Sequence, residues 1–305
     1  MESNHDHLLR REISYPLNDG DLNLNGTPSI ERRGVIDSVA EYAMLTNIMP
    51  SFPGQTIPPL NPKEVEWLLK EKHHGSASPE FDADVERLKA GEPLAYVIGW
   101  IPFLDCKIDV TLHPMIPRPE TEYWLERAIN ELRAKNLPTL RLADTFSGSG
   151  CIGVALLKHL PNATVDISEY DPKLTEQIRM NVRLNNIDET RAKVWAGDAL
   201  EGLTGTYDAI FANPPYIDPK AIPEMDASVI NYEPHLSLFA GEHGLDYIKL
   251  IINEGGKFLN EGGSFYIECD AHQREWITEL MTGTPWRYEF WNDQYGQIRY
   301  LILRK

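Results

Sequence analysis

The sequence predicts an α/β fold in which helices cover both faces of a mostly parallel sheet, preceded by a small helical domain and a β-hairpin linker. Two observations predict it. From residue 139 onward, short apolar runs alternate with segments of helical periodicity, which is the pattern of successive βαβ units. The last two apolar runs, residues 287–291 and 298–303, are joined by residues 292–297 alone. Because that connection is too short for a crossover helix, we expect one antiparallel strand at the end of the sheet.

The composition is that of a soluble globular protein with room for one large and one smaller domain. The chain has 305 residues, of which 42% are hydrophobic and 25% are charged. No apolar run reaches the roughly 18 residues of a membrane-spanning helix. The formal net charge of −17 repels phosphate backbones. We therefore expect neither a membrane nor a nucleic acid as a direct partner.

The cysteines and the first residues predict an intracellular protein. Cys106, Cys151 and Cys269 are widely spaced and odd in number, which fits neither a disulfide framework nor a metal site. No metal is therefore expected. The first residues are acidic and lack the apolar core of a secretory signal.

The N-terminal part is predicted to consist of a leader and a helical domain. Residues 1–30 are polar and without periodicity, so we expect a mobile leader. Residues 31–92 are assigned to the helical domain. Its first helix is expected at residues 34–49. A Pro-rich connector follows at residues 50–62, and a second helix is expected to begin at Pro62. A third helix is expected at residues 79–89, before Gly91.

A linker and the catalytic domain are predicted to follow. Residues 93–115 alternate and carry aromatic and β-branched side chains, which is typical of a β-hairpin. The catalytic domain is assigned to residues 116–305, and its first helix to residues 119–135, where Pro119 and acidic residues suit a helix N-terminus. Further strands are expected at 139–144, 163–169, 192–198, 206–213 and 264–268, and further helices at 148–160, 172–184, 244–258 and 272–281.

A glycine-rich turn links the first strand to its helix and predicts a nucleotide-like ligand. Gly148, Gly150 and Gly153 match the G-x-G-x-x-G pattern, in which glycine permits a sharp turn and close approach of a ligand. Glu169 ends the second strand, where its carboxylate can accept hydrogen bonds from both ribose hydroxyls. Asp198 ends the third strand and can accept from an adenine amino group. These features serve either NAD or S-adenosylmethionine.

A proline-stiffened loop follows the fourth strand and predicts a site for a planar NH2 group. Asn213 is followed by Pro214, Pro215 and Tyr216. Two prolines end a central strand, and ligands bind at the carboxyl edge of an open α/β sheet. Asn213 and Pro214 are each followed by a proline, which holds their backbone carbonyls in fixed directions. Tyr216 adds a flat face. Hydride transfer does not need such a loop, whereas a methyl acceptor with an NH2 group does.

With these motifs, the sequence resembles the HemK/PrmC family of protein-glutamine N5-methyltransferases, which modify peptide-chain release factors. The resemblance covers residue 91 to the C-terminus. It rests on the glycine turn, on Asn213 to Tyr216, and on the sequences at residues 91–96, 116–122 and 232–234.

The resemblance implies a class I S-adenosylmethionine-dependent methyltransferase fold, Rossmann-like with a seven-stranded sheet, and a release factor as substrate. It implies that Glu169 holds the ribose of S-adenosylmethionine, that Asp198 and Ala199 flank the adenine, and that Asn213 lies beside the cofactor. It implies that the methionine part is lined by Phe146, Ser147, Gly148, Ser149 and Gly150. It implies that the substrate glutamine is held by Asn213, Pro214, Pro215 and Tyr216.

The sequence departs from the family pattern at three positions in the expected cofactor site. Phe146 stands where many relatives have glycine, and Glu169 stands where aspartate is commoner. Ala199 stands where bacterial relatives often have an aromatic residue.

Three alternative functions remain open. An adenine-N6 or guanine-N2 nucleic-acid methyltransferase uses a similar loop for the same kind of NH2 group. An NAD-dependent oxidoreductase would use the glycine turn, and a catalytically silent scaffold would keep only the fold. The extended, Pro-rich N-terminal region resembles organelle-targeted eukaryotic relatives. We therefore expect the mitochondrial matrix as its location if the chain is eukaryotic, and the cytoplasm otherwise. We also expect a monomer.

Overall fold

The computed structural model describes residues 59–305. The predicted leader, the helix at residues 34–49 and most of the Pro-rich connector lie outside these residues. The next two predicted helices are confirmed as α3 (Pro62–Glu71) and α4 (Pro79–Lys89). Each helix begins with a proline, and the residue before that proline caps the helix with its side chain. Asn61 accepts a hydrogen bond from the N–H of Lys63, and Ser78 accepts one from the N–H of Phe81.

The expectation of a hairpin over the whole linker is wrong at its beginning. Residues Leu94–Ile98 form the short helix α5, which ends at Gly99 with a left-handed φ of 94°. Leu94 and Val97 lie on one face of this turn and pack with Leu68 and Leu88 of α3 and α4. The apolar residues therefore follow a helical spacing, and burial against the helical domain makes this segment helical. The hairpin itself consists of β1 (Trp100–Phe103) and β2 (Cys106–Asp109).

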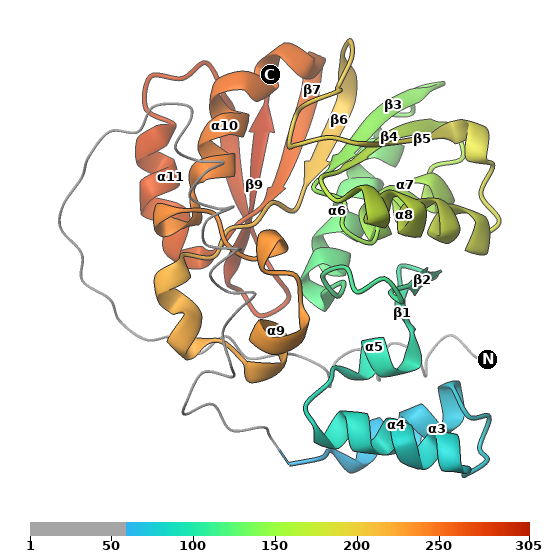
Figure 1. Ribbon diagram of the computed structural model, residues 1–305. Coiled ribbons are helices and arrows are strands. Elements are labelled where there is room, and N and C mark those ends of the chain that lie inside the picture. The colour runs from blue at the N-terminus through green and yellow to red at the C-terminus, as the bar shows by residue number, and fades with distance from the viewer. Residues whose placement is uncertain (1–58) are drawn as a thin grey trace.

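The main domain is the predicted α/β sheet (Figure 1). Its strands are β3 (Leu140–Thr145), β4 (Ala163–Glu169), β5 (Ala192–Ala196), β6 (Tyr207–Ala212), β7 (Leu259–Glu268), β8 (Arg287–Asn292) and β9 (Ile298–Arg304). Its helices are α6 (Pro119–Ala134), α7 (Cys151–His159), α8 (Pro172–Leu184), α9 (Ala227–Tyr232), α10 (Asp246–Glu254) and α11 (Arg274–Leu280). The strand order is β5-β4-β3-β6-β7-β9-β8.

This strand order places the reversal of chain direction along the sheet between β3 and β6. From β3 the chain winds outward through β4 to β5, and then returns to the other side of β3 as β6. Ligands of open α/β sheets bind at such a point, outside the carboxyl ends of the two strands. Thr145 pairs with Ala212, so that Phe146 and Asn213 leave neighbouring strands at the same edge.

The expectation that the antiparallel strand lies at the end of the sheet is wrong by one position. β9 is antiparallel to both of its neighbours, and β8 lies at the edge, parallel to the remaining strands. The burial of the two strands explains the order. Leu301, Ile302 and Leu303 of β9 are fully buried, whereas Arg287 and Glu289 of β8 are exposed. The more apolar strand of the hairpin therefore takes the inner position.

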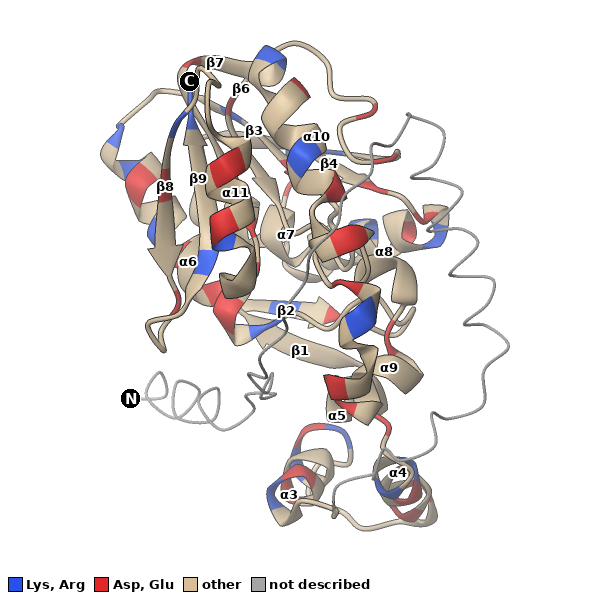
Figure 2. Ribbon diagram, turned by 90° about the vertical axis from the view of Figure 1, so that its left-hand side faces the viewer, with Lys and Arg blue, Asp and Glu red and all other residues tan. Residues whose placement is uncertain are grey.

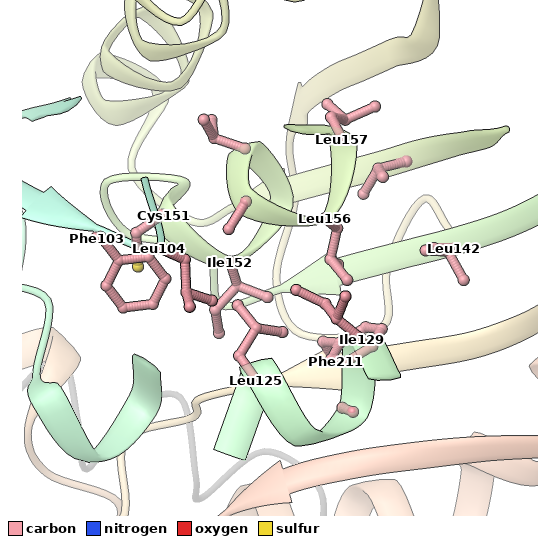
Figure 3. Close-up of a cluster of buried hydrophobic side chains, with 14 of the residues drawn as sticks. Phe103, Leu104, Leu125, Ile129, Leu142, Cys151, Ile152, Leu156, Leu157 and Phe211 are labelled. Atoms are coloured by element: carbon pink, nitrogen blue, oxygen red, sulfur yellow. The ribbon is translucent and has the colours of Figure 1, made fainter. Parts of the chain in front are cut away.

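Two hydrophobic clusters cover the two faces of the sheet. One contains residues of α6, α7 and α8, and the other contains residues of α10 and α11. Figure 3 shows part of the first, in which Leu125 and Ile129 of α6 meet Ile152 of α7 against Phe211 of β6. Burial of this apolar surface fixes α6 and α7 on the sheet and so fixes the turns that lead into them. Within residues 59–305, no helix has both the length and the apolar character needed to cross a membrane.

Candidate active site

The glycine turn leaves β3 at the predicted place and has one open side. Gly148 and Gly150 have φ values of 53° and 78°, which favour glycine. A Cβ atom at Gly150 would lie 2.9 Å from Cγ1 of Ile178, so the turn is packed against α8 there. A Cβ atom at Gly148 would meet nothing within 4 Å. A ligand can therefore approach the backbone at Gly148.

The buried carboxyl of Asp144 supports the turn from below. Its Oδ2 atom accepts a hydrogen bond of 2.9 Å from the N–H of Gly153, in the first turn of α7. The side chain is fully buried, and burial raises its pKa to about 7. The folded protein therefore binds this proton more tightly than the unfolded chain does, where the pKa of an aspartate is about 3.9.

We expect Asp144→Asn to change how stability depends on pH. In the wild type, the raised pKa makes the free energy of unfolding fall as the pH rises from about 4 to about 7. An asparagine has no such proton. The Tm of the variant minus that of the wild type should therefore increase between about pH 5 and about pH 7 in thermal melts. Parallel Tm profiles for the two proteins would contradict this role.

Glu169 joins the end of β4 to the glycine turn. Its Oε2 atom accepts a 2.7 Å hydrogen bond from the N–H of Gly148, and its Oε1 atom accepts one of 2.9 Å from the N–H of Asp171. The side chain is buried, and burial raises the pKa of its carboxyl. Each carboxylate oxygen has a second lone pair. Glu169 can therefore accept hydrogen bonds from the hydroxyl groups of a ligand while its carboxylate still bonds the N–H of Gly148 in the turn.

The loop after β5 lies next to Glu169. The N–H of Gly197 donates to the backbone oxygen of Glu169 over 2.9 Å. Burial, with the charge of Glu201, raises the pKa of the following Asp198. Ala199 has a φ of 47° and is buried. The loop thus carries a half-buried carboxyl beside the predicted ribose position.

An aromatic pair closes this region on the side of α10. The ring of Tyr247 lies 4.8 Å from the ring of Phe146, at an interplanar angle of 71°. Burial raises the pKa of the Tyr247 hydroxyl, and the nearby acidic groups of Asp198 and Glu169 raise it further. Sequence reasoning missed Tyr247, because α10 reaches the turn only through the packing of the sheet.

The amide of Asn213 is held at its nitrogen end, and its oxygen end is buried. Its Nδ2 atom donates a long hydrogen bond of 3.5 Å to Oγ1 of Thr121. Its Oδ1 atom is buried and has no hydrogen-bond partner among residues 59–305. A buried acceptor without a donor is costly, and it is typical of a site that a ligand completes. Pro214 and Pro215 are buried and hold the loop.

Tyr216 is anchored at both ends of the residue. Its hydroxyl donates to Oε1 of Glu268 over 3.2 Å, and its backbone oxygen accepts from Nε2 of Gln273 over 3.1 Å. Burial and the charge of Glu268 raise the pKa of the hydroxyl well above its ordinary value. Tyr216 is therefore a neutral phenol.

Two residues behind this loop were not predicted from sequence. Glu268 ends β7 and is fully buried, where burial raises its pKa. It accepts from Oγ1 of Thr121 over 2.7 Å and from Nε1 of Trp124 over 3.1 Å. Thr121 belongs to the segment 116–122 that sequence analysis singled out without a role for this residue, whereas Glu268 gave no signal beyond its place at a strand end.

The remaining sequence motifs lie together beside the loop. Arg118 donates to Oε1 of Glu233 over 2.6 Å, and Oε2 of Glu233 accepts from the N–H of Ile116 over 3.2 Å. The hydroxyl of Tyr96 donates to the backbone oxygen of Pro114 over 2.6 Å. The segments around residues 96, 116 and 233 are thus fastened to one another. Around them, residues 217–243, for which no element was predicted, form α9, short 3-10 turns and a small apolar cluster of their own.

The strand order, the glycine turn and the proline-stiffened loop define a class I S-adenosylmethionine-dependent methyltransferase fold. Residues 129–232 match the family model described as the methyltransferase small domain. The release factor glutamine methyltransferase of Francisella tularensis is 36% identical over 204 residues, which are 67% of this chain and 70% of that protein. The chain belongs to the release factor glutamine methyltransferase family.

Other relatives extend the comparison. The release factor glutamine methyltransferase of Streptococcus pneumoniae is 29% identical over 256 residues, which are 83% of this chain and 90% of that protein. Among solved structures, the ribosomal protein L11 methylase of Lactobacillus delbrueckii subsp. bulgaricus has 19% identity and a TM-score of 0.47. The match covers 65% of this chain and 84% of that one.

Proposed function

We infer that this protein transfers a methyl group from S-adenosylmethionine to the side-chain nitrogen of a glutamine in a peptide-chain release factor. The observation that carries the proposal is the buried Oδ1 atom of Asn213, which has no hydrogen-bond donor in the described part of the chain. It lies beside the glycine turn, because β3 and β6 are neighbours in register. The names of the relatives, release factor glutamine methyltransferases, support the same substrate.

The residues at the sheet edge fit S-adenosylmethionine. This cofactor carries a ribose with two hydroxyls, an adenine amino group and a sulfonium cation. Glu169 has lone pairs to spare for the ribose, and we assign Asp198 and Ala199 to the adenine. The open side of the turn at Gly148 leaves space for the methionine part, along with Phe146, Ser147, Ser149 and Gly150. When bound, the cofactor supplies an activated methyl group.

In our proposal, the loop of residues 213–216 prepares the glutamine nitrogen for attack. An amide nitrogen is a poor nucleophile, because its lone pair is delocalised into the carbonyl. Oδ1 of Asn213 and the backbone oxygen of Pro214 accept hydrogen bonds from the two N–H groups of the glutamine amide. The lone pair of its nitrogen is thereby directed toward the methyl group. The same acceptors stabilise the positive charge that develops on nitrogen. Alignment of this kind contributes several kcal/mol, up to about 7–11 in favourable cases.

No strong base is needed before the transfer. Burial raises the pKa of the Tyr216 hydroxyl, so Tyr216 acts as a neutral wall and an anchor and does not abstract a proton. The proton leaves the methylated nitrogen afterwards, to water. The same acceptors discriminate against glutamate, because a carboxylate has no hydrogens to donate to them.

We expect Phe146→Gly to weaken cofactor binding. Phe146 adopts a φ of 59°, which an aromatic residue rarely does, and its ring packs on that of Tyr247 in α10. An aromatic ring beside a cation contributes about 0.5–2 kcal/mol. The Kd for S-adenosylmethionine, measured by calorimetry, should therefore rise by about 2-fold to 30-fold.

A matched control separates the ring from the backbone. Asn186 is exposed and also has a positive φ, of 54°, after the end of α8. Asn186→Gly makes the same backbone change at a distance from the turn and should leave the Kd unchanged. If Phe146→Gly bound the cofactor as tightly as this control, the ring would have no part in the site.

The rival substrate is a base in nucleic acid. The net charge of −17 disfavours it. Figure 2 shows basic residues interspersed with acidic ones on helices such as α3 and α4, and not gathered along one element. Incubation with labelled S-adenosylmethionine and either a release factor or nucleic acid tests the proposal. We expect label in the protein at glutamine, and label in nucleic acid alone would overturn the assignment.

We also propose that the catalytic domain comprises residues 116–305 and that the enzyme acts as a monomer inside the cell. For a eukaryotic chain we propose the mitochondrial matrix, on the resemblance of its N-terminal region to organelle-targeted relatives, and for any other chain the cytoplasm. Light scattering tests the oligomeric state, and fractionation of cells tests the location.

A further inference from the structure

A chain of buried hydrogen bonds runs from the core of the sheet to the amide of Asn213. It starts at Glu268, at the carboxyl end of β7, and passes through Thr121 in the first turn of α6. Oγ1 of Thr121 donates to Oε2 of Glu268 over 2.7 Å and faces Nδ2 of Asn213 at 3.5 Å. Thr121 and Glu268 are each 1% exposed, so water does not compete for these bonds.

With Glu268 as a carboxylate, which only accepts hydrogen bonds, the chemistry of each group gives every bond in this chain a direction. The indole N–H of Trp124 only donates, so Oε2 of Glu268, at 3.1 Å from it, is an acceptor. The hydroxyl of Thr121 must then spend its one hydrogen on Glu268 and offers a lone pair to its other neighbour. Only the NH2 end of the Asn213 amide can donate to that lone pair. The oxygen end is thereby turned away from Thr121.

The same carboxylate also holds the far end of the loop. Its Oε1 atom accepts from the hydroxyl of Tyr216 over 3.2 Å. Hydrogen bonds thus connect both Asn213, through Thr121, and Tyr216 to the carboxylate of Glu268. Glu268 lies on β7, an element that contributes no residue to the predicted site. This leaves Oδ1 of Asn213 as the one end of the amide without a partner in residues 59–305.

We infer that Thr121 and Glu268 are positioning residues that set the polarity of the Asn213 amide, and thereby make the site specific for an acceptor that carries hydrogens on nitrogen. The inference rests on the proposed function and deepens it. An amide in the opposite orientation would present NH2, which suits a carbonyl or carboxylate oxygen of the substrate. With the chain of bonds intact, the site presents an oxygen, which suits the NH2 of a carboxamide.

The test replaces the hydroxyl of Thr121 and keeps its shape. Thr121→Val has nearly the same volume and lacks the hydroxyl, so the Asn213 amide loses its fixed orientation. With a release factor as substrate, we expect kcat to fall by about 10-fold to 100-fold, as for other small errors of alignment. The Kd for S-adenosylmethionine should stay at the wild-type value. Thr121→Ser restores the hydroxyl and should restore kcat to within about 2-fold.

A double variant shows whether Thr121 acts through Asn213. If it does, Thr121→Val should cost nothing further in a protein that already carries Asn213→Ala. If Thr121 only supports the fold, its cost should add in full to that of Asn213→Ala. Thr278→Val, an exposed change of the same kind on α11, serves as the control and should leave kcat unchanged.

The outcomes separate the two proposals. A wild-type protein that methylates the release factor, together with a Thr121→Val variant of equal kcat or with fully additive costs, overturns the positioning role alone. A wild-type protein that binds S-adenosylmethionine and transfers no methyl group to the release factor overturns the proposed function, and the positioning role with it. A loss of kcat that serine rescues and that does not add to Asn213→Ala supports both.

Discussion

Asn213→Ala is expected to lower kcat for methyl transfer to a release factor by about 10²–10³-fold, the typical cost of removing one preorganised group that stabilises developing charge. The variant removes a buried oxygen that follows β6 and has no hydrogen-bond donor within residues 59–305. It removes nothing that holds the glycine turn, since Glu169 bonds the turn independently. The Kd for S-adenosylmethionine should therefore change little. Single-turnover kinetics with saturating cofactor measure the effect.

Asn130→Ala provides the control for this experiment. Asn130 is an exposed amide on α6 and bonds only Arg133 among the contacts of its side chain in the described chain. Its loss should leave both kcat and the Kd at wild-type values. Near-normal turnover by Asn213→Ala would show that its amide oxygen does not hold the substrate nitrogen.

Glu169→Ala is expected to raise the Kd for S-adenosylmethionine by about 100-fold or more. A hydrogen bond to a charged group contributes about 1.5–3 kcal/mol, and two ribose hydroxyls would lose this acceptor. The variant also releases the N–H of Gly148, which Glu169 holds at 2.7 Å, so the turn loses an anchor. Calorimetry with the cofactor alone measures the loss without any release factor present.

The control for Glu169→Ala removes a charge of the same sign elsewhere. The side chain of Glu261 on β7 is 91% exposed, so Glu261→Ala tests the effect of net charge alone. It should leave the Kd unchanged. A Glu169→Ala variant that binds the cofactor as tightly as Glu261→Ala would remove Glu169 from the ribose site.

Local chemistry explains why several elements were predicted at their observed bounds. The helix α4, the strand β4 and the helix α8 begin and end where the sequence placed them. Prolines at the first helical position and capping side chains mark the starts of α4 and α8, and both signals act over a few residues. The first strands and the glycine turn were also predictable from local signals, namely the apolar runs and the glycines of the turn.

The errors lie where burial against distant residues decided the outcome. The segment Leu94–Ile98 is too short for periodicity to choose between helix and strand, and contact with Leu68 and Leu88 made it helical. The order of β8 and β9 at the sheet edge depends on which strand buries more apolar surface.

The sequence by itself determined the strand and helix alternation, the glycine turn and the loop at Asn213, because each depends on backbone preferences of neighbouring residues. Only the tertiary structure decided which end of the Asn213 amide faces the site. That choice depends on Thr121 and Glu268, which are separated from each other by 147 positions in the chain. A hydrogen bond has a direction that residue types alone do not state, and the folded core supplies it by burying donors and acceptors in one fixed order.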